Sequence, residues 1–455
     1  MKFKHFLFPS ILFLLSHITL AQSPPQSDAR IYDIINAVSS QRIEADIKTL
    51  AGFGTRHTLS DTISSVRGIG AARRWIWSEF EKISSECNGC LEVVETWGLV
   101  VPGESRRIPD STWIVNEMAI KRGTVYPNRY IIMSGDIDSR ISDPLNATDD
   151  SPGANDNASG MAGVIEAARV LTKYDFPNSI IFLGLSGEEQ GLFGGKHLAA
   201  KAKENGWNII GILNNDMIGN ISGIDGIVDN RSFRIFSETS SSEPSRQETI
   251  WNRFYGGEVD GPSRQLARYV HRMTKKYMPE MKPKLVYRLD RFGRGGHHRP
   301  FNDEGFAGIR IMETHEDYTR QHQDIRVEDG IHYGDVIEGV NFDYAAKMTA
   351  VNAINLAGIA WAPPQPTFVE IGGAVRPSTR LKWECPEDPN IAGFKIYWRD
   401  TTAPQWEHSR FVPADVKDFT LENVIIDNFL FGVATVGRDG NESIVVYPKT
   451  LIRRR

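Results

Sequence analysis

Acidic side chains follow the apolar segments of this chain at the points where those segments end. Residues 179–185 are apolar nearly throughout, and Glu188 and Glu189 follow them in a turn bounded by Gly187 and Gly191. Two carboxylates in such a turn can have different roles in hydrolysis, because one can bind a metal ion while its neighbour accepts a proton. The same order recurs elsewhere: Asp136 and Asp138 follow residues 129–134, Asp216 follows residues 208–213, and Glu313, His315 and His322 follow residues 307–312.

These side chains are predicted to meet at one edge of a sheet. The loop at 150–157 contains Asp156 and opens a segment whose apolar residues recur at helical spacing. An acidic loop, a helix, a buried strand and a second acidic loop are typical of half an α/β domain. Ligands bind beyond the carboxyl ends of the strands in such a sheet, and like charges gather there when a cation holds them. The sequence therefore predicts a metal site.

Further segments complete the predicted α/β domain. Two long polar segments, 222–261 and 290–305, contain few apolar residues and are expected to be loops of the functional or mobile kind. The regular elements, recognised by their hydrophobic periodicity, are helices at 30–50, 68–83 and 342–360 and strands at 91–101 and 111–120.

A second domain is expected after the proline-rich segment 361–366, since 455 residues are long for one domain and a proline cluster stiffens a linker. We place the domain boundary between residues 362 and 363. The later segment resembles a fibronectin type III module and holds no titratable cluster, so it is expected to be dispensable for chemistry. Its short alternating strands, predicted at 380–383, 393–399, 419–421 and 429–437, are typical of a β-sandwich.

The N-terminus is typical of a signal peptide, predicted at residues 1–21. Lys2 and Lys4 precede a short apolar run that ends in small residues at Ala21. The mature chain is therefore expected to be secreted or periplasmic, without a membrane anchor. A net charge of -5 and the absence of a basic block argue against nucleic acid as a partner.

The three cysteines do not define the fold. Cys87 and Cys90 are close enough to form a small disulfide loop in an oxidising compartment, with a zinc knuckle and a redox motif as the alternatives. Cys385 is interpreted as a buried free thiol.

Three motifs resemble those of a known family: GANDNASG at 153–160, GEEQGL at 187–192 and NNDMIG at 214–219. Residues 31–360 resemble the co-catalytic zinc aminopeptidases of clan MH, of the bacterial leucyl aminopeptidase and vacuolar aminopeptidase Y type. That group also includes glutaminyl cyclases. The resemblance implies a mixed central β-sheet flanked by helices, followed here by the small β-sandwich.

The resemblance also implies roles for single residues. Asp156 would bridge two zinc ions and precede a cis peptide bond, and Glu188 would be the general base. His322 is preferred to His315 as a ligand because it lies in the segment RQHQD, which matches the family's last ligand. The remaining roles would be ligation of one zinc by Glu189 and His322, ligation of the other by Asp136 and Asp216, and support by Asp138.

Two positions depart from the family's pattern. Asp136 stands where the motif has histidine, and His297 stands where relatives usually have aspartate. A site of Asp136, Asp156 and Asp216 offers oxygen alone, which suits harder cations than zinc. We therefore expect two unequal sites, with the Asp136 side weaker or occupied by another divalent cation.

The predicted function is hydrolysis of N-terminal residues from peptides by a secreted zinc metallopeptidase. A single-zinc acyltransferase resembling glutaminyl cyclase is the first alternative. A catalytically impaired binding protein is the second, because the usual histidine ligand is replaced by Asp136. Metal content and a release assay on aminoacyl-nitroanilides would separate the three hypotheses.

Overall fold

The structure is a computed structural model that describes residue 24 and residues 27–239 and 244–452. The predicted signal peptide at 1–21 lies outside these residues. Within the described part of the chain, no helix combines the length and the apolar character needed to cross a membrane.

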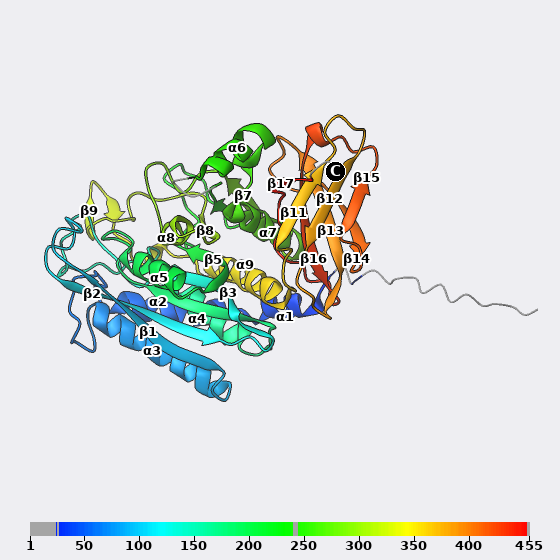
Figure 1. Cartoon of the computed structure of the whole chain (residues 1–455). Coiled ribbons are helices and arrows are strands. Elements are labelled where there is room, and N and C mark those ends of the chain that lie inside the picture. The colour runs from blue at the N-terminus through cyan, green and yellow to red at the C-terminus, as the bar shows by residue number, and fades with distance from the viewer. Residues whose placement is uncertain (1–23, 25–26, 240–243, 453–455) are drawn as a thin grey trace, which may run out of the picture.

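An eight-stranded mixed sheet forms the centre of the molecule, as the sequence predicted (Figure 1). Its strand order is β1-β2-β4-β3-β5-β8-β6-β7, and the four inner strands β4, β3, β5 and β8 run parallel. Their carboxyl ends therefore open on one edge. The strands are β1 (Leu91–Val100), β2 (Thr112–Lys121), β3 (Tyr126–Asp136), β4 (Asn178–Leu185), β5 (Asn208–Asn215), β6 (Ser232–Phe236), β7 (Lys282–Val286) and β8 (Gly308–Glu313).

Helices cover both faces of this sheet, and strand β4 shows why. Ile180 and Phe182 join the core formed with α4, α7 and α9, whereas Ile181 and Leu183 join the core formed with α5 and α8. This alternation with period two is that of a strand buried on both faces. The helices are α1 (Ala29–Ala37), α2 (Ser40–Gly52), α3 (Ile69–Glu86), α4 (Ala158–Leu171), α5 (Phe193–Glu204), α6 (Arg246–Tyr255), α7 (Pro262–Tyr277), α8 (His298–Asp303) and α9 (Phe342–Trp361).

Three sequence predictions of local structure were wrong. The helix expected at 30–50 is two helices, because Ser39 caps α2 by accepting a hydrogen bond from the backbone of Arg42. The segment 222–261 contains β6 and α6 rather than loop alone, and the segment 290–305 contains α8. Helix α6 is short and has no buried residue, so its sequence does not carry the broad apolar face of a core helix.

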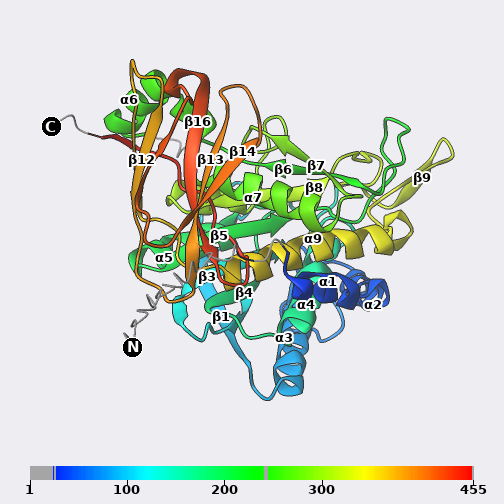
Figure 2. The same cartoon turned by 90° about the vertical axis from the view of Figure 1, so that its right-hand side faces the viewer.

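The last part of the chain forms the predicted β-sandwich. Two sheets, of order β15-β12-β11-β17 and β14-β13-β16, share a core around Trp383 and Phe394. In both views the sandwich lies at the opposite end of the molecule from the hairpin β9 (Arg326–Glu328) and β10 (Ile331–Tyr333) (Figures 1 and 2). Its strands are β11 (Phe368–Gly372), β12 (Thr379–Glu384), β13 (Ile391–Asp400), β14 (His408–Pro413), β15 (Asp418–Leu421), β16 (Phe429–Gly437) and β17 (Thr450–Leu451).

Buried ion pairs join the sandwich to the α/β part. Asp260, just before α7, lies 2.5 Å from Nη1 of Arg268 and 3.0 Å from Nη2 of Arg399 on β13. The sandwich is therefore packed against the sheet and its helices. Elsewhere Cys87 and Cys90 are joined in a disulfide between α3 and β1, and Cys385 is a half-buried free thiol.

Candidate metal centre

Three predicted ligands lie together beyond the carboxyl ends of the parallel strands. Among the described residues, Asp156, Glu189 and His322 form a group whose ligand atoms all lie within 4.8 Å of one another. Nε2 of His322 is 2.9 Å from Oε1 of Glu189 and 3.1 Å from Oδ2 of Asp156. The three residues precede α4, follow β4 and follow β8, so the sheet topology brings them to one crevice.

The loop that carries Asp156 is fixed by carboxylates and amides. The carboxylate of Asp335 accepts hydrogen bonds from the backbone N–H groups of Asn155 and Asp156, at 2.9 and 2.7 Å. The side chain of Asn155 donates to Glu313, which therefore braces the loop. The peptide bond between Asp156 and Asn157 is cis, which confirms that prediction.

Asp138 holds the turn that presents Glu188 and Glu189. Its two carboxylate oxygens accept the backbone N–H groups of Glu188 at 3.2 Å and of Glu189 at 3.1 Å. The hydroxyl of Thr58 donates to the same carboxylate at 3.0 Å. Gly187, at φ +74°, allows the backbone to turn there. Asp138 thus positions both acidic side chains through their backbone.

Glu188 is free to act on a bound molecule. Its side chain is partly exposed, and its carboxylate accepts no hydrogen bond from the residues that the structure describes. Burial, together with the negative charge of Glu189, raises the pKa of Glu188 well above its usual range. A carboxylate of raised pKa is suited to accept a proton in catalysis.

The carboxylates of Asp156 and Glu189 and the imidazole of His322 stabilise one another's charged forms. Burial would raise the pKa of Asp156, but the hydrogen bond and charge of His322 outweigh burial and hold that pKa well below its usual range. Burial likewise opposes protonation of His322, but Glu189 and Asp156 raise its pKa to about 9. The two carboxylates therefore favour a positive charge between them.

Arg140 contacts two members of the group and was missed by the sequence analysis. Its Nε donates to Oε2 of Glu189 at 2.8 Å, and its Nη2 lies 2.7 Å from Nδ1 of His322. Arg140 thereby orients both side chains. The only sequence signal was its place two residues after Asp138.

The structure does not bring Asp136, Asp156 and Asp216 together as a second group of this kind within the described residues. Asp136 contacts His297 and Asp216 contacts Arg310, each at 2.5 Å. His315 lies outside the group of three as well, since its Nδ1 is 2.7 Å from Oδ2 of Asp225.

The residues of the first group fit a zinc ion. Two carboxylates and one imidazole are ligands of catalytic zinc sites, which have three protein ligands and one open position. Glu188, which is partly exposed, directly precedes the ligand Glu189 in the sequence. The fold and this geometry define the class of metal-dependent hydrolases built on an α/β sheet.

Comparisons with known proteins agree with this class. Residues 117–333 match the model of Peptidase family M28. A probable zinc metalloprotease of Pyrenophora tritici-repentis is 39% identical over 435 residues, which are 95% of this chain and 89% of the relative. The chain therefore belongs to Peptidase family M28 and is a zinc metallopeptidase by family.

Solved structures share the fold. The LapA aminopeptidase of Legionella pneumophila superimposes with a TM-score of 0.52 at 16% identity, over 75% of this chain and 77% of that chain. A leucine aminopeptidase precursor from Bacteroides thetaiotaomicron superimposes with a TM-score of 0.50 at 13% identity, over 74% and 99%.

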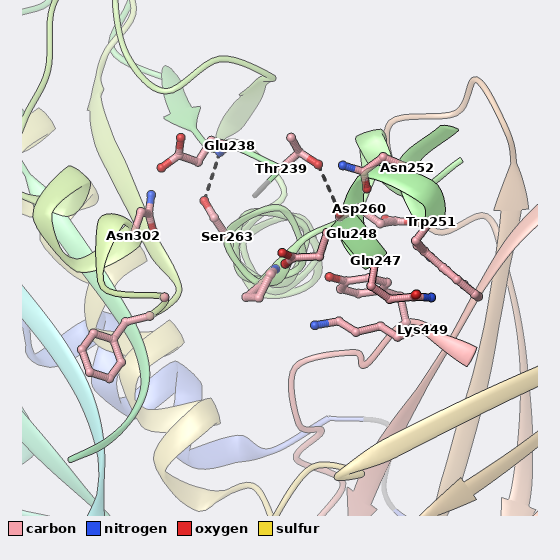
Figure 3. Close-up of a pocket in the computed structure, with 14 residues that line it drawn as sticks. Glu238, Thr239, Gln247, Glu248, Trp251, Asn252, Asp260, Ser263, Asn302 and Lys449 are labelled. Atoms are coloured by element: carbon pink, nitrogen blue, oxygen red, sulfur yellow. Dashed lines mark hydrogen bonds between the residues drawn. The ribbon is translucent and has the colours of Figure 1, made fainter. Parts of the chain in front are cut away.

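A separate cavity of about 230 Å³ lies away from this centre, between α6, the start of α7 and Lys449 (Figure 3). Among its lining residues, the backbone N–H of Glu238 donates to the hydroxyl of Ser263 and the hydroxyl of Thr239 donates to the backbone carbonyl of Asp260, each at 3.2 Å. None of its lining residues belongs to the candidate metal centre.

Proposed function

We propose that this chain is a secreted zinc aminopeptidase that removes N-terminal residues from peptides, with Glu188 as general base. The observation that carries the proposal is the relation of Glu188 to its neighbour. Glu189 belongs to the group of three ligands, while Glu188, on the same turn, is partly exposed and its carboxylate accepts no hydrogen bond from the described residues.

A zinc ion held by Asp156, Glu189 and His322 would polarise the substrate carbonyl and acidify a water molecule. Glu188 accepts the proton of the attacking water as the oxygen bonds to the carbonyl carbon. It then donates that proton to the leaving nitrogen as the C–N bond breaks. Asp138 keeps Glu188 in place through the backbone N–H groups of the turn.

The charges around the centre favour an amine rather than a carboxylate as the recognised end of the peptide. Three arginines face carboxylates of this region and are engaged by them: Arg140 with Glu189, Arg291 with Glu316, and Arg310 with Asp216 and Asp290. None of these three guanidinium groups is left without a carboxylate, so none is available to bind the C-terminal carboxylate of a peptide. The acidic side chains of the region complement a protonated N-terminal amine instead.

The test compares peptides that differ only at their ends. Zinc-loaded protein should release nitroaniline from leucyl-p-nitroanilide and not from its N-acetylated form, and should shorten a C-terminally amidated peptide from its N-terminus. Removal of zinc by a chelator should abolish release, and added zinc should restore it. Cleavage of the N-acetylated peptide from its C-terminus would show a carboxypeptidase instead.

One observation favours an alternative, a single-zinc acyltransferase that cyclises N-terminal glutamine. The described residues bring together one group of three ligands rather than two. Incubation of a glutaminyl peptide separates the two functions, because cyclisation releases ammonia and leaves the peptide bond intact. An aminopeptidase releases free glutamine.

We also propose that residues 1–21 are removed on export and that residues 22–362 form the peptidase domain. Mass spectrometry of the protein recovered outside the cytoplasm should then show a mature N-terminus at Gln22. An intact Met1 in that fraction would contradict the proposed processing.

A further inference from the structure

A buried arginine faces one of the residues predicted to hold a second metal ion. Arg310 lies in the middle of β8, and its side chain is fully buried. Its Nη2 is 2.5 Å from Oδ2 of Asp216, and its Nη1 donates to Oδ2 of Asp290 at 2.7 Å. The N–H bonds of Nη2 do not point at Asp216, so this contact is an ion pair rather than an aligned hydrogen bond. Asp216 therefore faces a permanent cation.

Asp136, the other ligand predicted for that site alone, is engaged as well. Its Oδ2 accepts a hydrogen bond from the side chain of Asn157 at 2.7 Å, and its Oδ1 lies 2.5 Å from Nδ1 of His297. Both Asp136 and His297 are buried. The amide of Asn157 also donates to the backbone carbonyl of Asn215 at 2.7 Å. The side-chain amide of Asn157 thus links Asp136, at the end of β3, to Asn215, at the end of β5.

A second dication at this position would lie beside the guanidinium of Arg310. Like charges repel strongly where water is excluded, because the effective dielectric constant is low. Removing a paired cation from buried carboxylates is costly as well, since it leaves them uncompensated. The residues present therefore do not fit a second zinc ion next to Asp216.

We propose that the centre holds a single zinc ion, at Asp156, Glu189 and His322, and that the guanidinium of Arg310 takes the place of the second metal ion. This proposal rests on the proposed zinc peptidase function. Arg310 is a positioning residue, which pairs with the carboxylates of Asp216 and Asp290. A cation that is part of the chain cannot be exchanged, so added manganese or cobalt should not activate the zinc-loaded enzyme.

Zinc stoichiometry tests the proposal directly. The full-length mature protein is stripped with a chelator, reloaded with excess zinc, desalted and measured by plasma mass spectrometry and native mass spectrometry. The wild type should retain one zinc per chain. Asp216→Asn should also retain one, because Asp216 serves Arg310 rather than a metal. Two zinc ions in the wild type, one of them lost in Asp216→Asn, would overturn the proposal.

Arg310→Met should allow a second zinc ion to bind next to Asp216. The carboxylates of Asp216 and Asp290 then lose their shared cation, and zinc per chain should rise from one toward two. Arg299→Met, which changes an exposed arginine of α8, is the matched control and should stay at one. If Arg310→Met does not fold, the comparison of wild type with Asp216→Asn decides alone. A folded Arg310→Met that stays at one zinc would contradict the role given to Arg310.

Asp136→His restores the histidine of the motif and tests whether Arg310 alone prevents the binding of a second zinc ion. With Arg310 present, this variant should remain at one zinc per chain, and only the double variant Asp136→His/Arg310→Met should approach two. Two zinc ions in Asp136→His alone would contradict the proposal. The aminopeptidase proposal can fail independently of the single-zinc proposal. One zinc per chain without hydrolysis of any N-terminal residue would refute the aminopeptidase activity but not the single-zinc centre.

Discussion

Nδ1 of His297 lies 2.5 Å from Oδ1 of Asp136, so the two positions at which this chain departs from its family's pattern are in contact. The pattern has histidine at the first position and aspartate at the second. This chain therefore keeps a histidine–aspartate pair, but the two residues have exchanged positions. Because both side chains are buried, neither can change alone without leaving its partner unsatisfied.

A double-mutant cycle should detect this exchange. Asp136→His and His297→Asp should each lower the free energy of unfolding by about 2–3 kcal/mol, because each leaves an unpaired buried polar group or charge. The double variant should recover at least half of the summed loss. Urea unfolding in zinc-saturated buffer provides the measurement. Strictly additive losses would show that the two positions are independent.

Asp138→Asn should loosen the turn of Glu188 and Glu189. An amide NH₂ in place of one carboxylate oxygen cannot accept a backbone N–H, so one of the two hydrogen bonds is lost. We expect a loss of about 10–100-fold in zinc affinity or kcat, the range found for groups that orient metal ligands. Asp143→Asn, at an exposed position nearby, is the control. Equal zinc affinity and kcat in both variants would remove Asp138 from this role.

Glu117 on β2 should make stability fall as pH rises. Its carboxylate is buried without a hydrogen-bond partner in the described part of the chain. Burial, aided by the charge of Glu95, raises the pKa of Glu117 to about 8, while Arg73 acts in the opposite direction. The folded state then binds more protons than the unfolded state between pH 4.5 and pH 8. In that window the wild type loses about 1.4 kcal/mol per pH unit through this group.

Glu117→Gln removes that titration and should gain stability relative to the wild type as pH rises through the same window. Unfolding by urea at several pH values measures the difference, and Glu81→Gln, an exposed position on α3, is the control. A difference that does not change with pH would contradict the raised pKa.

Arg399 should contribute to stability and not to chemistry. It is 1% exposed and pairs with Asp260 across the contact between the sandwich and the α/β part. Arg399→Ala leaves that buried carboxylate with one cation fewer, so we expect a loss of about 3 kcal/mol with unchanged zinc content and kcat. Arg410→Ala on β14, an exposed position, should stay within about 0.5 kcal/mol of the wild type. A loss of zinc in Arg399→Ala would show that the sandwich supports the centre itself.

The central sheet could be predicted because its strands carry strong local patterns. Residues 179–185 are apolar nearly throughout and are followed by a glycine-bounded acidic turn, which is enough to place both the strand and its functional end. Helix α6 could not be predicted in the same way, since it buries no side chain and its polar sequence reads as loop. Its boundaries depend on the capping box of Ser245 and Glu248 instead.

The metal ligands that follow the ends of strands could be predicted from the sequence. The pairings between buried side chains that are far apart in the sequence could not. Arg310 stands inside the apolar sequence GIRIME, and a charge in a buried strand is a signal that its partner lies elsewhere in the fold. The sequence does not say that the partners are Asp216 and Asp290. The contact of Asp136 with His297 is of the same kind, because each position taken alone reads only as a departure from a motif.

The most direct test of the account is the comparison of Glu188→Gln with Glu189→Gln in zinc content and turnover. Glu188→Gln should keep the zinc of the wild type while kcat falls by about two orders of magnitude or more, because the proton acceptor is lost and the ligands are intact. Glu189→Gln should lose zinc, because it removes a ligand. Near-normal turnover in Glu188→Gln, or loss of its zinc, would contradict the assignment of these two neighbours.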